Sequence, residues 1–246
     1  MIQRLLLIAA LAGAAASLLS LAACTTTQER SANLSKAAAT AAEAKKFKVG
    51  ETNAVVTKAS VTRLQGKDAA TIVVRVKNSG DKPQVAVPIG VDLYDAKDAS
   101  LYTNRIDGLE PALNMVPVAP PGETWWVNNQ VAVARPAKTR VRIGTSKVAP
   151  PADLPKMRLT ALKFGEDEGV ITGKGKVKNL SAVDQLRLTV YAVATKGGKV
   201  VAAGRSVIDR VPAKDKPQRF AIYFTGDPRG ADVHVFAPPS TLGGAQ

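Results

Sequence analysis

The stretch that decides the fold is Thr71-Ile72-Val73-Val74-Arg75-Val76-Lys77, and the turn sequence Asn78-Ser79-Gly80-Asp81-Lys82-Pro83 follows it directly. β-Branched residues dominate the first stretch, and such residues favour the extended backbone of a strand. Asn, Gly and Pro favour turns, because each suits a backbone conformation that a turn requires. We therefore predict a β-strand that ends at Asn78.

Short strands and turns continue on both sides of this stretch. Ala54 to Leu64 precedes it, and Val85 to Tyr94, Thr124 to Val133 and Thr139 to Ile143 follow it. Turn sequences recur about every 8–12 residues and no helical period interrupts them, which is typical of a β-sandwich.

The same pattern occurs a second time in the chain. Val76-Lys77-Asn78-Ser79 parallels Val177-Lys178-Asn179-Leu180-Ser181, and Val91-Asp92-Leu93-Tyr94 parallels Leu188-Thr189-Val190-Tyr191. A tandem repeat explains this spacing more simply than one large fold. We predict an all-β chain with two tandem β-sandwich domains, at 47–146 and 157–237, joined by a Pro-rich linker at 147–156. The Pro-, Gly- and Ser-rich residues 238–246 are expected to be a disordered tail.

The first residues have the order of a signal peptide. Arg4 supplies a positive charge, Leu5 to Leu21 is apolar, and small residues precede Cys24. Leu21-Ala22-Ala23-Cys24 resembles the lipobox of bacterial lipoproteins. That resemblance implies removal of residues 1–23, diacylglycerol on the Cys24 thiol, and acylation of the new N-terminus. The resemblance also implies that these acyl chains anchor the protein to the outer face of the cell membrane, or to the outer membrane of a diderm cell.

Two other interpretations of this segment are an uncleaved transmembrane helix and an ordinary signal with an incidental cysteine. The apolar run is near the lower limit of about 17–25 residues for a bilayer span. Cys24 is the only cysteine in the chain and stands where a lipobox requires it. Residues 24–46, polar and Ala-rich, are then predicted to be a flexible spacer after the lipidated cysteine.

Further motifs resemble a family of secreted bacterial lipoproteins with immunoglobulin-like domains. These motifs are Val49-Gly50-Glu51, the turn after Asn78, and Val91-Asp92-Leu93-Tyr94-Asp95. They are similar to the telokin-like domain of unknown function and to the FxLYD domain, although Val91 replaces the Phe of FxLYD and the second copy keeps only Tyr191. The resemblance spans 47–144 and, more loosely, 157–237. It implies seven-stranded sandwiches without catalytic residues.

Positive charge is the main compositional feature. The formal net charge is +14, and no run of four or more Lys and Arg residues occurs. We expect no nucleic-acid partner, because the chain is predicted to be exported and lacks a basic stripe with interleaved aromatic residues. An anionic envelope polymer, a lipid headgroup surface or another envelope protein suits a diffuse positive charge. The alternative is that the charge serves solubility alone.

Residues for catalysis or metal binding are scarce. His234 is the only histidine, which excludes a site built from several His and Cys ligands. A Ser-His-Asp triad would need His234, which lies in an alternating strand pattern without a Gly-x-Ser-x-Gly elbow. Gly173-Lys174-Gly175-Lys176 resembles half of a phosphate loop but favours a strand. The acidic residues within 92–98 and 166–168 could hold Ca²⁺ through their carboxylate oxygens. A role as solvated carboxylates in turns accounts better for their presence. We therefore expect no catalytic residue, cofactor or metal.

Trp125-Trp126 is the most informative pair for binding. Adjacent strand residues point to opposite faces, so one indole can fill a core while the other needs separate cover. That cover is the second domain, a bulge or a ligand, and the pair is our candidate surface contact.

The sequence thus predicts a non-catalytic binding or scaffolding module of the cell envelope. A carrier of a small ligand or an anionic polymer is the alternative, and a hydrolase that uses Asp and Glu carboxylates is a further one.

Overall fold

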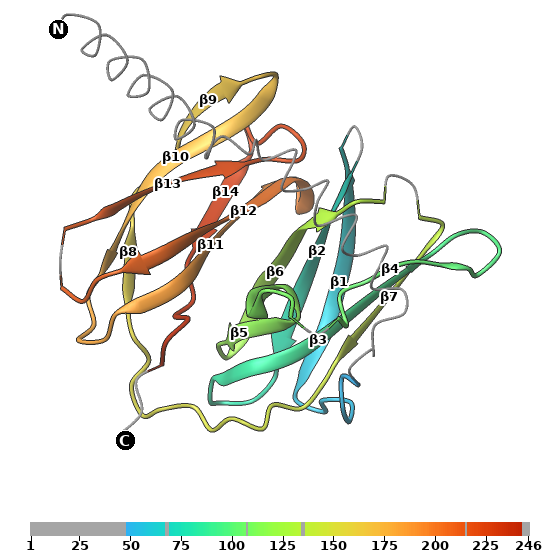
Figure 1. Cartoon of the computed structure of the whole chain (residues 1–246), viewed down its shortest axis with the longest axis horizontal. Helices are drawn as coiled ribbons and strands as arrows, with labels where there is room; N and C mark the ends of the chain where they lie inside the picture. Colours follow the sequence, from blue (N-terminus) through green and yellow to red (C-terminus); the bar gives the residue numbers. More distant parts are fainter. Residues whose placement is uncertain (1–47, 67–68, 107, 134–135, 215, 243–246) are drawn as a thin grey trace, which may run out of the picture.

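The structure is a computed structural model that describes residues 48–66, 69–106, 108–133, 136–214 and 216–242 (Figure 1). Across those residues the chain has fourteen strands and one short 3-10 helix, which confirms the predicted all-β class. The predicted signal peptide at 1–23, the lipobox with Cys24, and the spacer at 24–46 lie outside the described residues. No helix in the described part of the chain is long and apolar enough to cross a membrane.

The first half, residues 48–146, pairs its strands into two antiparallel sheets. One sheet has the order β1-β2-β6, and in the other β3 pairs with β4, β5 and β7. Its elements are β1 (Val56–Gln65), β2 (Ala70–Asn78), β3 (Gln84–Tyr94), β4 (Ser100–Thr103), η2 (Pro111–Leu113), β5 (Met115–Ala119), β6 (Gly122–Val131) and β7 (Lys138–Ile143).

The second half, residues 157–242, repeats this pairing scheme. One sheet has the order β8-β10-β13 with β9 also on β10, and the other has the order β12-β11-β14. Its elements are β8 (Met157–Leu159), β9 (Lys163–Asp167), β10 (Val170–Asn179), β11 (Gln185–Lys196), β12 (Lys199–Val211), β13 (Gln218–Tyr223) and β14 (Asp232–Phe236).

The repeated asparagines end equivalent strands, as the sequence predicts. Each side-chain amide donates to the carbonyl four residues ahead and to a carbonyl on another strand, and each side-chain oxygen accepts from the backbone N–H two residues ahead. These bonds satisfy polar groups where the ladder stops. The carbonyl acceptors are Lys82 and Ala119 for Asn78, at 2.9 Å each, and Val183 at 2.8 Å and Val211 at 3.2 Å for Asn179.

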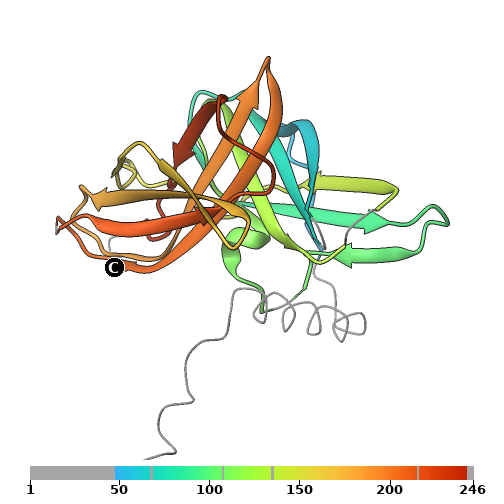
Figure 2. The ribbon, with the colours of Figure 1, turned by 90° about the horizontal axis from the view of Figure 1, so that it is seen from above.

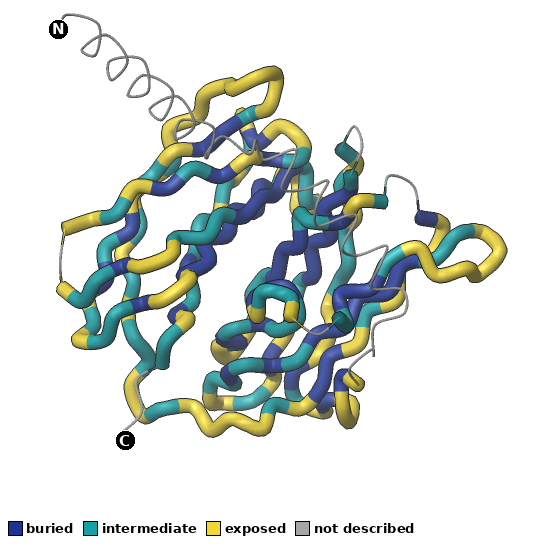
Figure 3. The backbone as a smooth tube through the Cα atoms, viewed as in Figure 1, coloured by how far each residue is buried: buried dark blue, intermediate teal, exposed yellow. Residues whose placement is uncertain are grey.

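Three apolar cores lie between the four sheets, so the sheets form four successive layers (Figure 2). The first core fills the space between the two sheets of the first half, and the second core does the same in the second half. The central core joins the halves: Val73 and Val127 from the first half pack with Tyr191, Val193 and Ala203 from the second. Buried residues accordingly run along the inner strands, while loops at the rim are exposed (Figure 3).

β2 shows how the sequence produces this layering. Ile72 and Val74 face the first core, and Val73 between them faces the central core. A strand with alternate side chains buried on both faces needs a continuous apolar run, and Ile72-Val73-Val74 supplies it.

A buried ion pair also crosses between the halves. Arg205 Nη2 on β12 lies 2.5 Å from Glu110 Oε2, and Thr189 Oγ1 donates to Glu110 Oε1 over 3.3 Å. The side chains of Arg205 and Glu110 are only 2% and 11% exposed. Glu110 precedes η2, which Trp126 holds by donating from Nε1 to the Ala112 carbonyl over 2.9 Å.

The segment Pro238 to Leu242, the described part of the predicted tail, is hydrogen-bonded to β11. The Oε1 atom of Gln185 accepts from the backbone N–H groups of Ser240 and Thr241, and its Nε2 atom donates to the Thr241 carbonyl. Gln185 is fully buried, so its amide needs these partners, and it holds the segment against β11. Residues 243–246 lie outside the described residues.

Removal of one member of the buried pair should destabilise the whole protein. We expect Glu110→Ala to lower the free energy of unfolding by about 3–5 kcal/mol, because it leaves the Arg205 charge buried without its partner. The double variant Glu110→Ala/Arg205→Met should recover most of that loss. Equilibrium urea unfolding measures both, and a cost below about 1 kcal/mol for the single variant would contradict a structural role for the pair.

Candidate functional site

The structure separates the two tryptophans by face. Trp126 is fully buried in the first core, so it offers no surface to a partner. Trp125 is half-buried, packs against the central core, and has the Arg75 guanidinium 5.6 Å from its ring centroid. Trp125 thus packs at the contact between the two halves, and cover by the second domain is one of the options that the sequence allows.

The acidic residues considered as calcium ligands are dispersed among other partners. Asp92 binds Arg105, Asp95 accepts from the N–H groups of its own turn, and Asp98 binds Lys138. In the described part of the chain no group of three or more His, Cys, Asp or Glu side chains could hold a metal ion. His234 lies exposed on β14, opposite Val193 in the strand register.

Three carboxyls have lowered pKa values, which does not suit a general acid. A hydrogen bond from Lys138 lowers the pKa of Asp98, and the N–H of Ala213 lowers that of Asp184. Hydrogen bonds from Arg229 bring the pKa of Asp227 to about 2. A carboxylate-based hydrolase needs one carboxyl with a raised pKa, so these three groups lend it no support.

Cations gather instead on the outer face of the last sheet. Three directly opposed residue pairs on β10 and its neighbours each consist of two cations. We call these six residues the basic face: Lys174 opposite Lys163 on β9, Lys176 opposite Arg219 on β13, and Lys178 opposite Arg158 on β8.

These six cations are not neutralised by ion pairs with the carboxylates that the structure describes. Five of them are exposed, while Lys178 is half-buried. Like charges directly opposite each other destabilise a sheet. The face therefore costs stability as it stands, and an anion bound between the pairs would relieve that cost.

Glycines set the alternation that produces this face. On β10, Gly173 and Gly175 take the inward positions, and lysines occupy the outward positions between and after them. A Cβ at Gly175 would lie 2.7 Å from Phe220 Cζ, and one at Gly173 would lie 2.8 Å from Leu162 Cδ1. Only glycine lets these apolar side chains approach the backbone so closely.

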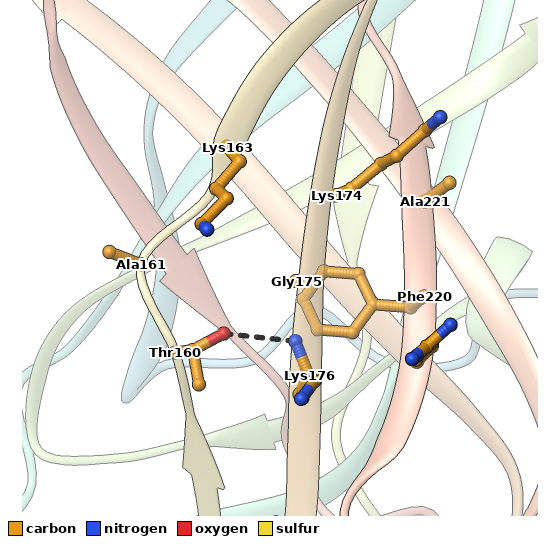
Figure 4. Close-up of a pocket in the computed structure, with 9 residues that line it drawn as sticks. Thr160, Ala161, Lys163, Lys174, Gly175, Lys176, Phe220 and Ala221 are labelled. Carbon is orange, nitrogen blue, oxygen red and sulfur yellow. Dashed lines mark hydrogen bonds between the residues drawn. The ribbon is translucent and has the colours of Figure 1, made fainter.

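A hollow of about 710 Å³ lies beside β10, and four residues of the basic face border it (Figure 4). Thr160 shapes one side: its hydroxyl accepts from the Lys176 N–H over 2.9 Å, and its own N–H donates to the Lys176 carbonyl over 3.0 Å. The Lys176 N–H thus donates to a side-chain hydroxyl where a paired strand would offer a backbone carbonyl. The backbone pairing with β10 is therefore interrupted between β8 and β9. The residues that line the hollow are Thr160, Ala161, Lys163, Lys174, Gly175, Lys176, Arg219, Phe220 and Ala221.

The hairpin that joins β9 to β10 places acidic residues at one end of the basic face. Its tip holds Glu166, Asp167 and Glu168, and Tyr223 donates its hydroxyl to Asp167 Oδ2 over 3.2 Å. That hydrogen bond raises the pKa of Tyr223, because it favours the protonated phenol. The charge therefore changes sign along the outer face.

The equivalent face in the first half has a different chemistry. If Asn78 and Asn179 are aligned, Val73 corresponds to Lys174 and Arg75 to Lys176. The registers Arg75–Trp125 and Lys176–Arg219 then place Trp125 where the second half has Arg219. The first face packs Val73 and Trp125 against the central core and has Arg75 and Lys77 nearer its rim, whereas the second face is cationic and exposed.

The basic face does not appear as a run of consecutive cations in the sequence, because its lysines alternate with other residues. The available signal was Lys174, Lys176 and Lys178 at every second position of a predicted strand, which places all three on one face. The opposing cations on three other strands could not be assigned to them without the registers.

Reversal of one charge should stabilise the sheet. We expect Arg219→Glu to raise the free energy of unfolding by about 0.2–1 kcal/mol, because an opposite-charge pair with Lys176 replaces two like charges. Urea unfolding at low salt measures the change. The matched control is Arg142→Glu, which alters net charge equally but stands opposite Gly90. If the control gains as much, the effect comes from net charge and not from the pair.

No family model matches the chain, and neither a curated protein nor a solved structure matches it. What the basic face can bind therefore follows from its own charge, register and exposure.

Proposed function

We propose that the protein is a lipid-anchored, extracytoplasmic lipoprotein that acts as a non-catalytic binding module of the cell envelope. In this proposal Cys24 carries the acyl chains, and the basic face binds an anionic polymer of the envelope. The observation that supports the binding role most directly is the set of three cation pairs on β10 and its neighbours.

An anionic partner explains why this arrangement persists despite its cost. Repulsion between opposed cations weakens the sheet, and residues at binding sites commonly break a local rule that the remaining structure obeys. The first half keeps the rule at the three matching positions, where the opposed residues are Val73 and Thr62, Arg75 and Trp125, and Lys77 and Thr57. The second half breaks it at all three pairs.

The binding role is tested with a labelled poly-glutamate chain and the full-length protein at about 0.15 M salt. We expect Lys174→Gln/Lys176→Gln to weaken binding about ten-fold, because each glutamine removes charge from one of the opposed pairs. The control Lys58→Gln/Arg142→Gln removes the same charge from exposed strand positions elsewhere. Equal losses in both double variants would show that net charge alone attracts the polymer and would contradict the proposal.

The anchor is tested by Cys24→Ala in cells. We expect the variant to move from the membrane fraction to the soluble fraction, because each buried CH₂ of an acyl chain contributes about 0.8 kcal/mol to membrane binding. Fractionation followed by immunoblotting measures the distribution. A variant that stays with membranes in high salt would contradict lipid anchoring at Cys24.

A further inference from the structure

We infer that the ligand of the basic face is a linear polyanion that runs along β10, places its anionic groups about 7 Å apart, and occupies the face with three of them. This inference rests on the proposed function and adds the geometry of the ligand to it.

The repeat length comes from the strand itself. Lys174, Lys176 and Lys178 occupy successive outward positions, and two residues of an extended strand span about 7 Å. Each lysine has a second cation directly opposite, so an anionic group above each pair contacts two charges at once. The second cation lies on β13 for Lys176 and on the other side of β10, on β9 and β8, for Lys174 and Lys178. A ligand with the same repeat that follows β10 therefore meets one pair at each anionic group.

The number of groups is limited at both ends of the face. At one end the charge becomes negative, where Asp167 and Tyr223 are hydrogen-bonded beside the hairpin tip. At the other end β10 stops at Asn179, whose side chain is committed to the turn. Three pairs lie between these limits. The next outward position is Leu180, whose N–H donates to the Lys156 carbonyl, so that position has one cation and not an opposed pair.

The neutral part of the ligand also has a defined place. Figure 4 shows Ala161 and Lys163 on one side of β10 and Ala221 on the other, with Lys174 and Lys176 on β10. Small side chains and the bare backbone of Gly175 thus lie between the cations. Neutral linkers between anionic groups fit there, and a chain lying in a hollow is favoured over a flat membrane surface.

Capped peptides test the length of the ligand. We use N-acetylated and C-amidated (Glu-Ser)n with n from one to five, because alternate residues of an extended peptide share a face about 7 Å apart. With the full-length protein at constant salt, we expect affinity to rise about five-fold per Glu up to three and to change less than about two-fold beyond three. An undiminished rise through five would overturn the limit of three groups.

A second peptide set tests the spacing. A peptide with three Glu residues and three Ser residues between each Glu and the next has the same charge as (Glu-Ser)₃. We expect this peptide to bind about ten-fold more weakly than (Glu-Ser)₃, because its carboxylates reach fewer of the cation pairs. Equal affinity of the two peptides would overturn the proposed spacing.

Phosphatidylglycerol vesicles test a membrane surface as the ligand. If such vesicles bind the basic face and (Glu-Ser)₃ does not displace them, the face binds a membrane and the inference is wrong.

The two proposals can fail separately in these measurements. If Lys174→Gln/Lys176→Gln weakens peptide binding while length and spacing have no effect, the linear geometry is wrong and the anionic binding role stands. If that double variant binds every peptide as well as Lys58→Gln/Arg142→Gln does, both proposals are wrong.

Discussion

The need to cover two adjacent indoles governs the arrangement of this protein. Trp125 and Trp126 point to opposite faces of β6, and Ile72-Val73-Val74 gives neighbouring β2 apolar side chains on both faces. A sheet that is apolar on both faces is stable only as an inner layer. The first half covers Trp126 with its own second sheet, and the second half covers the other face with Tyr191, Val193 and Ala203.

The same constraint explains why the basic face lies on an outermost sheet of the stack. Once β11 and β12 cover the first half, the matching sheet of the second half is an outermost layer, with one face in the second core and the other in solvent. That outer face can carry charge without desolvation. Lys174 and Arg219 stand there, where the first half has Val73 and Trp125. The repeat has therefore kept its inner face and changed its outer face.

The sequence predicted most of the long strands, the repeated asparagines and the all-β class, because alternation and turn residues act locally. It did not predict the short strands β4 and β5. It predicted neither the central core nor the basic face. Alternation tells which residues share a face but not which sheet covers that face. The partners of Lys176 and Lys178 are Arg219 and Arg158, which lie on other strands, and only the registers bring them together. Gln185 likewise holds Ser240 through long-range contacts that tail composition does not reveal.

Ionic screening distinguishes the basic face from the net charge of +14 as the source of the proposed anion binding. At physiological ionic strength the Debye length is about 8 Å, so exposed charges that are farther apart act almost independently. Cross-strand neighbours lie about 5 Å apart, and successive pairs along a strand about 7 Å apart, so both distances fall within that length. The six cations therefore attract an anion together, while charges spread over the rest of both halves are largely screened. A local arrangement of modest charge consequently outweighs a larger diffuse one.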